Sequence, residues 1–155
     1  KNYTMMGDAV NLAARLESAA KQYGAYIQIS EDTQKNLVEG TFIYRSLDTV
    51  RVVGKSLPVK TFELLQKVGC ENEEQLTQLV ELWEEARKCY LSMMWDEAIQ
   101  LFTQCLDLEP HHPDRDPGSK TTPSHVYIQR CENYKVNPPV APGMEWDGVY
   151  IATEK

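Results

Sequence analysis

A short stretch near the start of the chain combines an apolar helical surface with two large polar side chains on one face. Gly7 and Asp8 offer a tight entry and an N-terminal cap, and small or aliphatic residues fill most of the positions that follow. Asn11 and Arg15 are four residues apart, so a helix places them side by side. An amide beside a permanent positive charge is a donor array suited to sugar and phosphate oxygens. The spacing also fits an ordinary amphipathic helix, and it does not decide between the two.

The run from Gly7 to Glu17, GDAVNLAARLE, resembles the signature of class III adenylate and guanylate cyclases. The resemblance implies that Asn11 orients the ribose of the nucleotide. It also implies that Arg15 stabilises the pentavalent α-phosphate while the 3′-hydroxyl attacks it. Thr4 stands where adenylate cyclases carry an Asp or a Thr that helps a distant Lys to recognise adenine. The substrate expected from this resemblance is therefore ATP.

The resemblance continues to about residue 66 through three further runs, which are Gln28–Ser30, Leu47–Lys55 and Pro58–Leu64. It implies the second half of a class III cyclase catalytic domain, which is an α+β, ferredoxin-like sandwich. Lys55 is the candidate for binding the substrate's phosphates, because Val53 occupies a position where many relatives have a Lys. We therefore expect residues 1–68 to form the C-terminal half of this catalytic domain.

In the family, the first half of the domain carries the two Asp residues that hold the metal ions. None of the corresponding motifs is found in this chain, so we expect Mg²⁺ or Mn²⁺ to be bound by residues outside it and no metal by this piece alone. The chain begins at Lys1 and enters directly on the signature, which predicts a C-terminal piece of a longer protein. Family sites form between two cyclase domains, so the resemblance also implies a head-to-tail homodimer.

These features favour an enzyme that converts ATP to cyclic AMP and pyrophosphate in intracellular signalling. This chain would supply the ribose-orienting and transition-state-stabilising residues. The alternative is a non-catalytic interaction or regulatory module, in which the rest of the chain recruits or senses a protein partner. Upstream sequence discriminates between the two hypotheses, because a pair of Asp residues at strand ends would favour the enzyme.

Composition excludes several other classes of function. The chain has 16 basic and 23 acidic residues, and the net charge of −7 opposes binding to nucleic acid. No apolar run approaches the roughly 18 residues of a membrane span, and no export signal opens the chain. We expect a cytoplasmic location, at the membrane's cytoplasmic face if the missing N-terminal part is anchored there. The cysteines lack a Cys-x-x-Cys pair and are expected to be reduced, namely Cys70, Cys89, Cys105 and Cys131.

Local patterns predict a helix, a strand, a helix and three more strands in residues 1–68. The signature helix should end near Tyr23, where Gly24 offers a C-cap, and a short strand should follow at residues 25–29. Ser30 should cap a helix over residues 31–38. Further strands are predicted at residues 42–45, 50–53 and 59–65, with a turn at Ser46–Thr49 between the first two.

A helical tail, residues 69–155, begins at a polar boundary. Apolar and aromatic residues recur at intervals of three and four across residues 73–108, and the short break at Ser92–Met94 predicts two antiparallel helices. The pair resembles one tetratricopeptide repeat through Trp83, Ala86, Tyr90, Ala98 and Phe102. A single repeat is too few to stack as a solenoid.

The last part of the tail begins with a loop at residues 109–123, which is rich in Pro and Gly. Metal binding by this loop is disfavoured by the spacing of His111, His112, Asp114 and Asp116. A third helix is expected at residues 124–135, with Thr122 or Ser124 as its N-cap. A terminal strand at residues 146–153, similar to the Trp-Asp-Gly-Val endings of bacterial cyclase tails, should pack back on the catalytic half.

Overall fold

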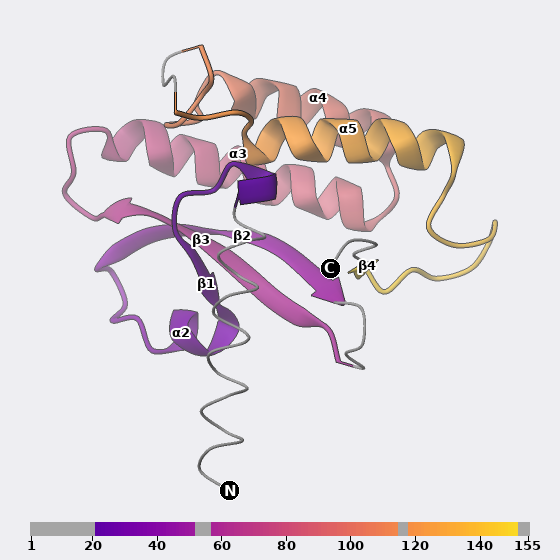
Figure 1. Cartoon of the computed structure of the whole chain (residues 1–155), viewed down its shortest axis with the longest axis horizontal. Coiled ribbons are helices and arrows are strands. Elements are labelled where there is room, and N and C mark those ends of the chain that lie inside the picture. Colours follow the sequence, from indigo (N-terminus) through magenta and orange to yellow (C-terminus); the bar gives the residue numbers. More distant parts are fainter. Residues whose placement is uncertain (1–20, 52–56, 115–117, 152–155) are drawn as a thin grey trace, which may run out of the picture.

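The computed structural model describes residues 21–51, 57–114 and 118–151, and it places three long helices over one face of a sheet (Figure 1). The strands are β1 (Gln28–Ser30), β2 (Phe42–Arg51), β3 (Val59–Lys67) and β4 (Tyr150–Ile151). The helices are α2 (Glu31–Lys35), α3 (Glu73–Leu91), α4 (Trp95–Leu106) and α5 (Pro123–Val136). This architecture confirms the predicted α+β class.

The sheet has the order β1-β3-β2-β4. β3 pairs antiparallel with both β1 and β2, whereas β4 lies parallel to β2 with Val50 opposite Tyr150. The predicted return of the chain's end to the sheet is therefore confirmed, but the strand is shorter than residues 146–153. Asp147 accepts a hydrogen bond from the Val149 amide at 3.0 Å, and this local turn delays the start of the strand. Residues 152 and 153 lie outside the described residues.

The predicted turn at Ser46–Thr49 is wrong, because β2 runs through it as one strand of ten residues. The register against β3 shifts between Ser46 and Asp48, which marks an irregularity that leaves Leu47 without a paired residue. Leu47 and Asp48 are both buried. The polar residues that indicated a turn are thus part of a buried contact with the helices.

Capping residues that can be recognised in the sequence determine where two of the helices begin or end. Gly24 follows the helical residues 21–23, has φ of +73° and donates its N–H to the Lys21 carbonyl at 3.3 Å, as predicted. The side chain of Thr122 accepts from the His125 amide at 3.1 Å, so Thr122 is the N-cap of α5. α2 ends at Lys35 instead of residue 38, since it buries no side chain that would extend it.

The helices and the sheet share one apolar core. α3 and α4 form the predicted helix pair around the turn at Ser92–Met94, and α4 also packs against α5. Trp83, Tyr90, Phe102 and Tyr127 are fully buried in the same cluster as Leu47 of β2. The buried cluster therefore extends across the sequence boundary at residue 69. Each of these aromatics contacts at least one other ring at centroid distances of 4.9–5.2 Å.

Candidate functional site

The residues that the resemblance assigns to catalysis and substrate binding lie outside the described part of the chain. They are Thr4, Asn11, Arg15 and Lys55, and Val53 is outside it as well. The described residues nearest to the signature are 21–23, the last turn of a helix. What the structure does describe is how that turn and the strands are held by the tail.

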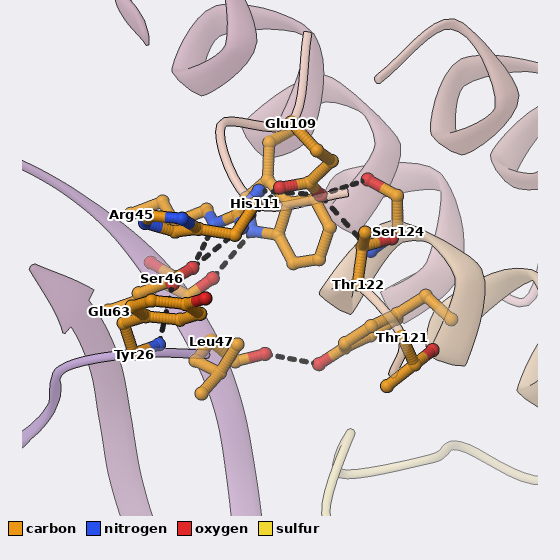
Figure 2. Close-up of polar contacts among 12 residues, drawn as sticks. Tyr26, Arg45, Ser46, Leu47, Glu63, Glu109, His111, Thr121, Thr122 and Ser124 are labelled. Atoms are coloured by element: carbon orange, nitrogen blue, oxygen red, sulfur yellow. Dashed lines mark hydrogen bonds and ion pairs between the residues drawn. The ribbon is translucent and has the colours of Figure 1, made fainter. Parts of the chain in front are cut away.

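A buried group of charged side chains, here called the Arg45 cluster, joins β2, β3 and the segment after α4 (Figure 2). Arg45 donates to Glu63 Oε1 from Nε at 2.9 Å and from Nη2 at 2.6 Å. It also donates to Glu109, from Nη1 at 3.1 Å and from Nη2 at 2.8 Å. The three side chains are 1–3% exposed, so this ionic contact is shielded from water.

The Arg45 cluster is completed by two neutral hydrogen-bond donors, Ser124 and the Tyr26 amide, and by the ring of Trp83. Ser124 donates to Glu109 Oε2 from its hydroxyl at 2.5 Å and from its amide at 3.2 Å. The Tyr26 amide donates to Glu63 Oε2 at 3.3 Å, and the Arg45 guanidinium lies 4.4 Å from the centroid of the Trp83 ring. Burial raises the pKa of Glu63, and the positive charge of Arg45 opposes that rise only in part.

A second buried group, the Asp48 cluster, connects the end of the signature segment to α5. Arg130 Nη1 donates to Asp48 Oδ2 at 2.8 Å, and Arg130 Nη2 donates to the Tyr23 hydroxyl at 3.1 Å. Tyr23 in turn donates its hydroxyl proton to Asp48 Oδ2. The Asp48 side chain is fully buried, and Arg87 of α3 lies 3.9 Å from its other oxygen. These contacts join residues 107 positions apart in the chain.

A second buried tyrosine, Tyr127, likewise accepts a hydrogen bond from an arginine of the tail and donates one to β2. The hydroxyl of Tyr127 accepts from Arg87 Nη1 at 2.7 Å and donates to the Leu47 carbonyl of β2. Burial raises the pKa of both Tyr23 and Tyr127, so each hydroxyl keeps its proton at neutral pH. Burial alone would lower the pKa of Arg130, but the Asp48 charge and the neighbouring phenols raise it.

The formal charges of the two clusters are complementary across the interface between sheet and helices. The strands contribute one positive and two negative charges, Arg45, Asp48 and Glu63. The tail contributes two positive charges and one negative charge, Arg87, Arg130 and Glu109. Because an unpaired buried charge costs several kcal/mol, roughly 3 to 5, neither side would bury these groups without the other.

Sequence reasoning missed both clusters. It assigned Asp48 to a turn and Glu109 to a loop, and it gave Arg87 no role. One signal was available, because Arg87 lies between Trp83 and Tyr90 on the apolar stripe of its helix. A charge on a buried stripe requires a buried partner. The sequence could not reveal which carboxylate that partner is.

The described carboxylates do not fit a metal ion. Within residues 21–51, 57–114 and 118–151, no group of three or more His, Cys, Asp or Glu side chains converges as metal ligands would. The buried carboxylates of Asp48 and Glu63 are instead engaged by guanidinium groups. The four cysteines are free thiols, as predicted. In the same ranges, no helix has both the length and the hydropathy that crossing a membrane requires.

The comparisons with known proteins agree with the signature. Residues 1–66 match the adenylate and guanylate cyclase catalytic domain. The chain is 30% identical over 132 residues to the adenylate cyclase of Dictyostelium discoideum described as terminal-differentiation specific, with 83% of this chain aligned. It is 41% identical over 63 residues, 39% of this chain, to an adenylate cyclase of Anabaena cylindrica. No solved structure matches the chain significantly.

The extent of these matches differs in an informative way. The chain spans 6% of the length of the Dictyostelium protein and 12% of the Anabaena protein. The family model covers only the first 66 residues, whereas the Dictyostelium alignment is 132 residues long and therefore extends into the helical tail. Both the cyclase segment and much of the tail are thus similar to parts of one adenylate cyclase.

Proposed function

We propose that this chain is part of a class III adenylate cyclase that converts ATP to cyclic AMP and pyrophosphate. The match of residues 1–66 to the cyclase catalytic domain carries the proposal, and the two relatives named as adenylate cyclases support the choice of ATP. In this proposal Asn11 orients the ribose, and Thr4 takes part in reading the adenine. The intact protein acts in the cytoplasm.

Arg15 has the central chemical role in this proposal. Attack of the ribose 3′-hydroxyl on the α-phosphate builds negative charge on the equatorial oxygens of phosphorus. A guanidinium keeps its charge at any physiological pH and presents a planar fork of donors, so it stabilises this charge without a proton transfer. Lys55 binds the triphosphate, whose pyrophosphate part leaves.

The remaining groups of the reaction come from elsewhere in the intact protein. Mg²⁺ or Mn²⁺ would activate the 3′-hydroxyl and neutralise the triphosphate, and the described residues of this chain do not offer its ligands. We propose that residues outside the chain hold the ions, and that a second cyclase domain faces Asn11 and Arg15 in a head-to-tail homodimer. The tail stabilises this half of the catalytic domain through the two buried clusters.

The substrate test compares the two purine nucleotides. The longer protein that we propose contains this chain is incubated with ATP or GTP and a divalent cation, and the cyclic product is identified by chromatography. We expect cyclic AMP and pyrophosphate, with kcat/KM for ATP above that for GTP, because the Thr4 hydroxyl can accept from the adenine amino group. Equal specificity constants would refute the assigned base preference, and the absence of any cyclic nucleotide would refute the reaction.

A further inference from the structure

The Asp48 cluster holds the one described turn that leads directly from the signature segment. Lys21 and Gln22 are exposed, whereas Tyr23 is 4% exposed and has hydrogen bonds to both Asp48 and Arg130. Gly24 then reverses the chain into the region of β1. The position of this helix end is therefore set by one buried phenol and its two charged partners.

The two hydrogen bonds of the Tyr23 hydroxyl fix the orientation of the helix end as well as the depth to which the Tyr23 side chain is buried. The hydroxyl donates to a carboxylate of β2 and accepts from a guanidinium of α5, so it is held between the sheet and the tail. Arg130 contacts Tyr23 and Asp48 with two different nitrogens of its planar guanidinium group. The Cζ atom of the same group lies 3.6 Å from the centroid of the Tyr150 ring in β4. Rotation of the helix end would break at least one of these buried contacts.

The sequence predicts one helix from the signature to Tyr23, and Tyr23 follows Arg15 by eight residues. That separation corresponds to about 12 Å along a helix. A tilt of about 5° at the anchored end would move a side chain by about 1 Å over this distance. Displacements of about 1 Å in a phosphoryl-transfer site can lower a rate by about 100-fold. Tyr23 is therefore close enough to Arg15 in sequence for a loss of its hydrogen bonds to lower the rate of the reaction.

We propose that Tyr23 is a positioning residue for the cyclisation reaction, held by Arg130 of the helical tail and Asp48 of β2. This inference rests on the proposed function. It gives the tail a specific part in the reaction, because an arginine more than a hundred residues from Arg15 in sequence holds the helical turn at residues 21–23 that follows the signature. The tail then belongs to the catalytic unit.

The chain offers a matched control for this proposal. Tyr127 has the same buried donor and acceptor arrangement as Tyr23, between Arg87 and the Leu47 carbonyl, but it is on α5 and does not touch residues 21–23 in these hydrogen bonds. Tyr23→Phe and Tyr127→Phe each delete one buried hydroxyl and keep the ring. A purely structural role predicts the same effect from both.

The first readout is steady-state kinetics in the longer protein. We expect Tyr23→Phe to lower kcat by about tenfold while KM for ATP stays within about twofold, because substrate contacts remain but are misaligned. Tyr127→Phe should leave kcat within about twofold. Arg130→Lys, which keeps the charge but cannot bridge Asp48 and Tyr23 with one fork, should reproduce the loss. An unchanged kcat in Tyr23→Phe, or equal losses in the two Phe variants, would overturn the proposal.

The second readout does not depend on catalysis. Amide hydrogen exchange of the 155-residue chain is followed in residues 9–23. We expect it to become about fivefold faster in Tyr23→Phe and to be unchanged in Tyr127→Phe. Exchange that responds equally to both variants would contradict anchoring by Tyr23. A wild-type protein without cyclase activity would refute the proposed function, whereas hydrogen exchange would still decide whether Tyr23 holds the helix.

Discussion

Replacement of Arg45 by Met tests the buried charges that join the sheet to the tail. Met retains the length and most of the volume of the arginine stem but removes four hydrogen bonds to two carboxylates. Glu63 and Glu109 would remain buried without their cation. Removing one partner from a buried ion pair costs about 3 to 5 kcal/mol, and we expect a loss of that size in the free energy of unfolding at pH 8.

The pH dependence of this loss gives a second signature. Burial already raises the pKa of Glu63, and loss of Arg45 would raise it further. A carboxyl group with a raised pKa in the folded state stabilises the fold below its unfolded pKa of about 4.3, and this contribution is lost as the pH rises through the folded value. The destabilisation by Arg45→Met should therefore be smaller at pH 5 than at pH 8.

Urea denaturation followed by tryptophan fluorescence measures both quantities, because Trp83 lies against Arg45 in the core. The control is Lys35→Met, which breaks an exposed ion pair with Glu31 at 3.8 Å and should change stability by less than about 0.5 kcal/mol. Glu109→Gln should destabilise the wild type but partly rescue Arg45→Met by removing a buried negative charge. A loss below about 1 kcal/mol at pH 8, or one independent of pH, would refute the buried-charge argument.

Three further predictions concern stability and reactivity. Gly24→Ala should lower the free energy of unfolding by more than about 2 kcal/mol, because an added Cβ would lie 2.1 Å from the Thr121 carbonyl oxygen. The control is Gly40→Ala, which has a similar φ of +79° but open space around the added Cβ and should cost only about 1 kcal/mol. Equal losses of stability in chemical denaturation would contradict this prediction. Trp83→Ala should cost about 3 to 5 kcal/mol in the same assay, and an unchanged midpoint would show that Trp83 is not a core residue. Burial raises the pKa of Cys105 and Cys131 to about 12, so both thiols should resist a disulfide reagent at pH 7.5. The half-buried Cys70 and Cys89 should react first. Mass spectrometry measures the order of modification, and the reverse order would disprove this prediction.

Features that depend on local chemistry were predictable from the sequence. Gly24 as a helix C-cap, the break at Ser92–Met94 and the aromatic stripe through Trp83 follow from backbone conformation and helical periodicity. The α+β class followed from the order of such elements. The terminal strand was placed near the correct residues, although its pairing with β2 was not specified.

Features that depend on distant partners were not predictable in the same way. Ser46, Asp48 and Thr49 are residue types that favour turns, but Asp48 lies within a strand because Arg130 and Tyr23 bind it and Arg130 neutralises its charge. Glu109 was assigned to a loop by its proline-rich surroundings, yet Arg45 holds it in the core. The candidate catalytic residues were found through resemblance, since the spacing of Asn11 and Arg15 is common to many helices.

The most direct test of the central proposal is the turnover of Arg15 variants in the longer protein with ATP. Arg15→Ala should lower kcat by about 100-fold or more while KM stays within a few fold, because the guanidinium acts on charge that develops only in the transition state. Arg15→Lys should recover only part of the rate, since its ammonium lacks the planar fork. An unchanged kcat in Arg15→Ala would remove Arg15 from the mechanism and contradict the proposed function of this chain.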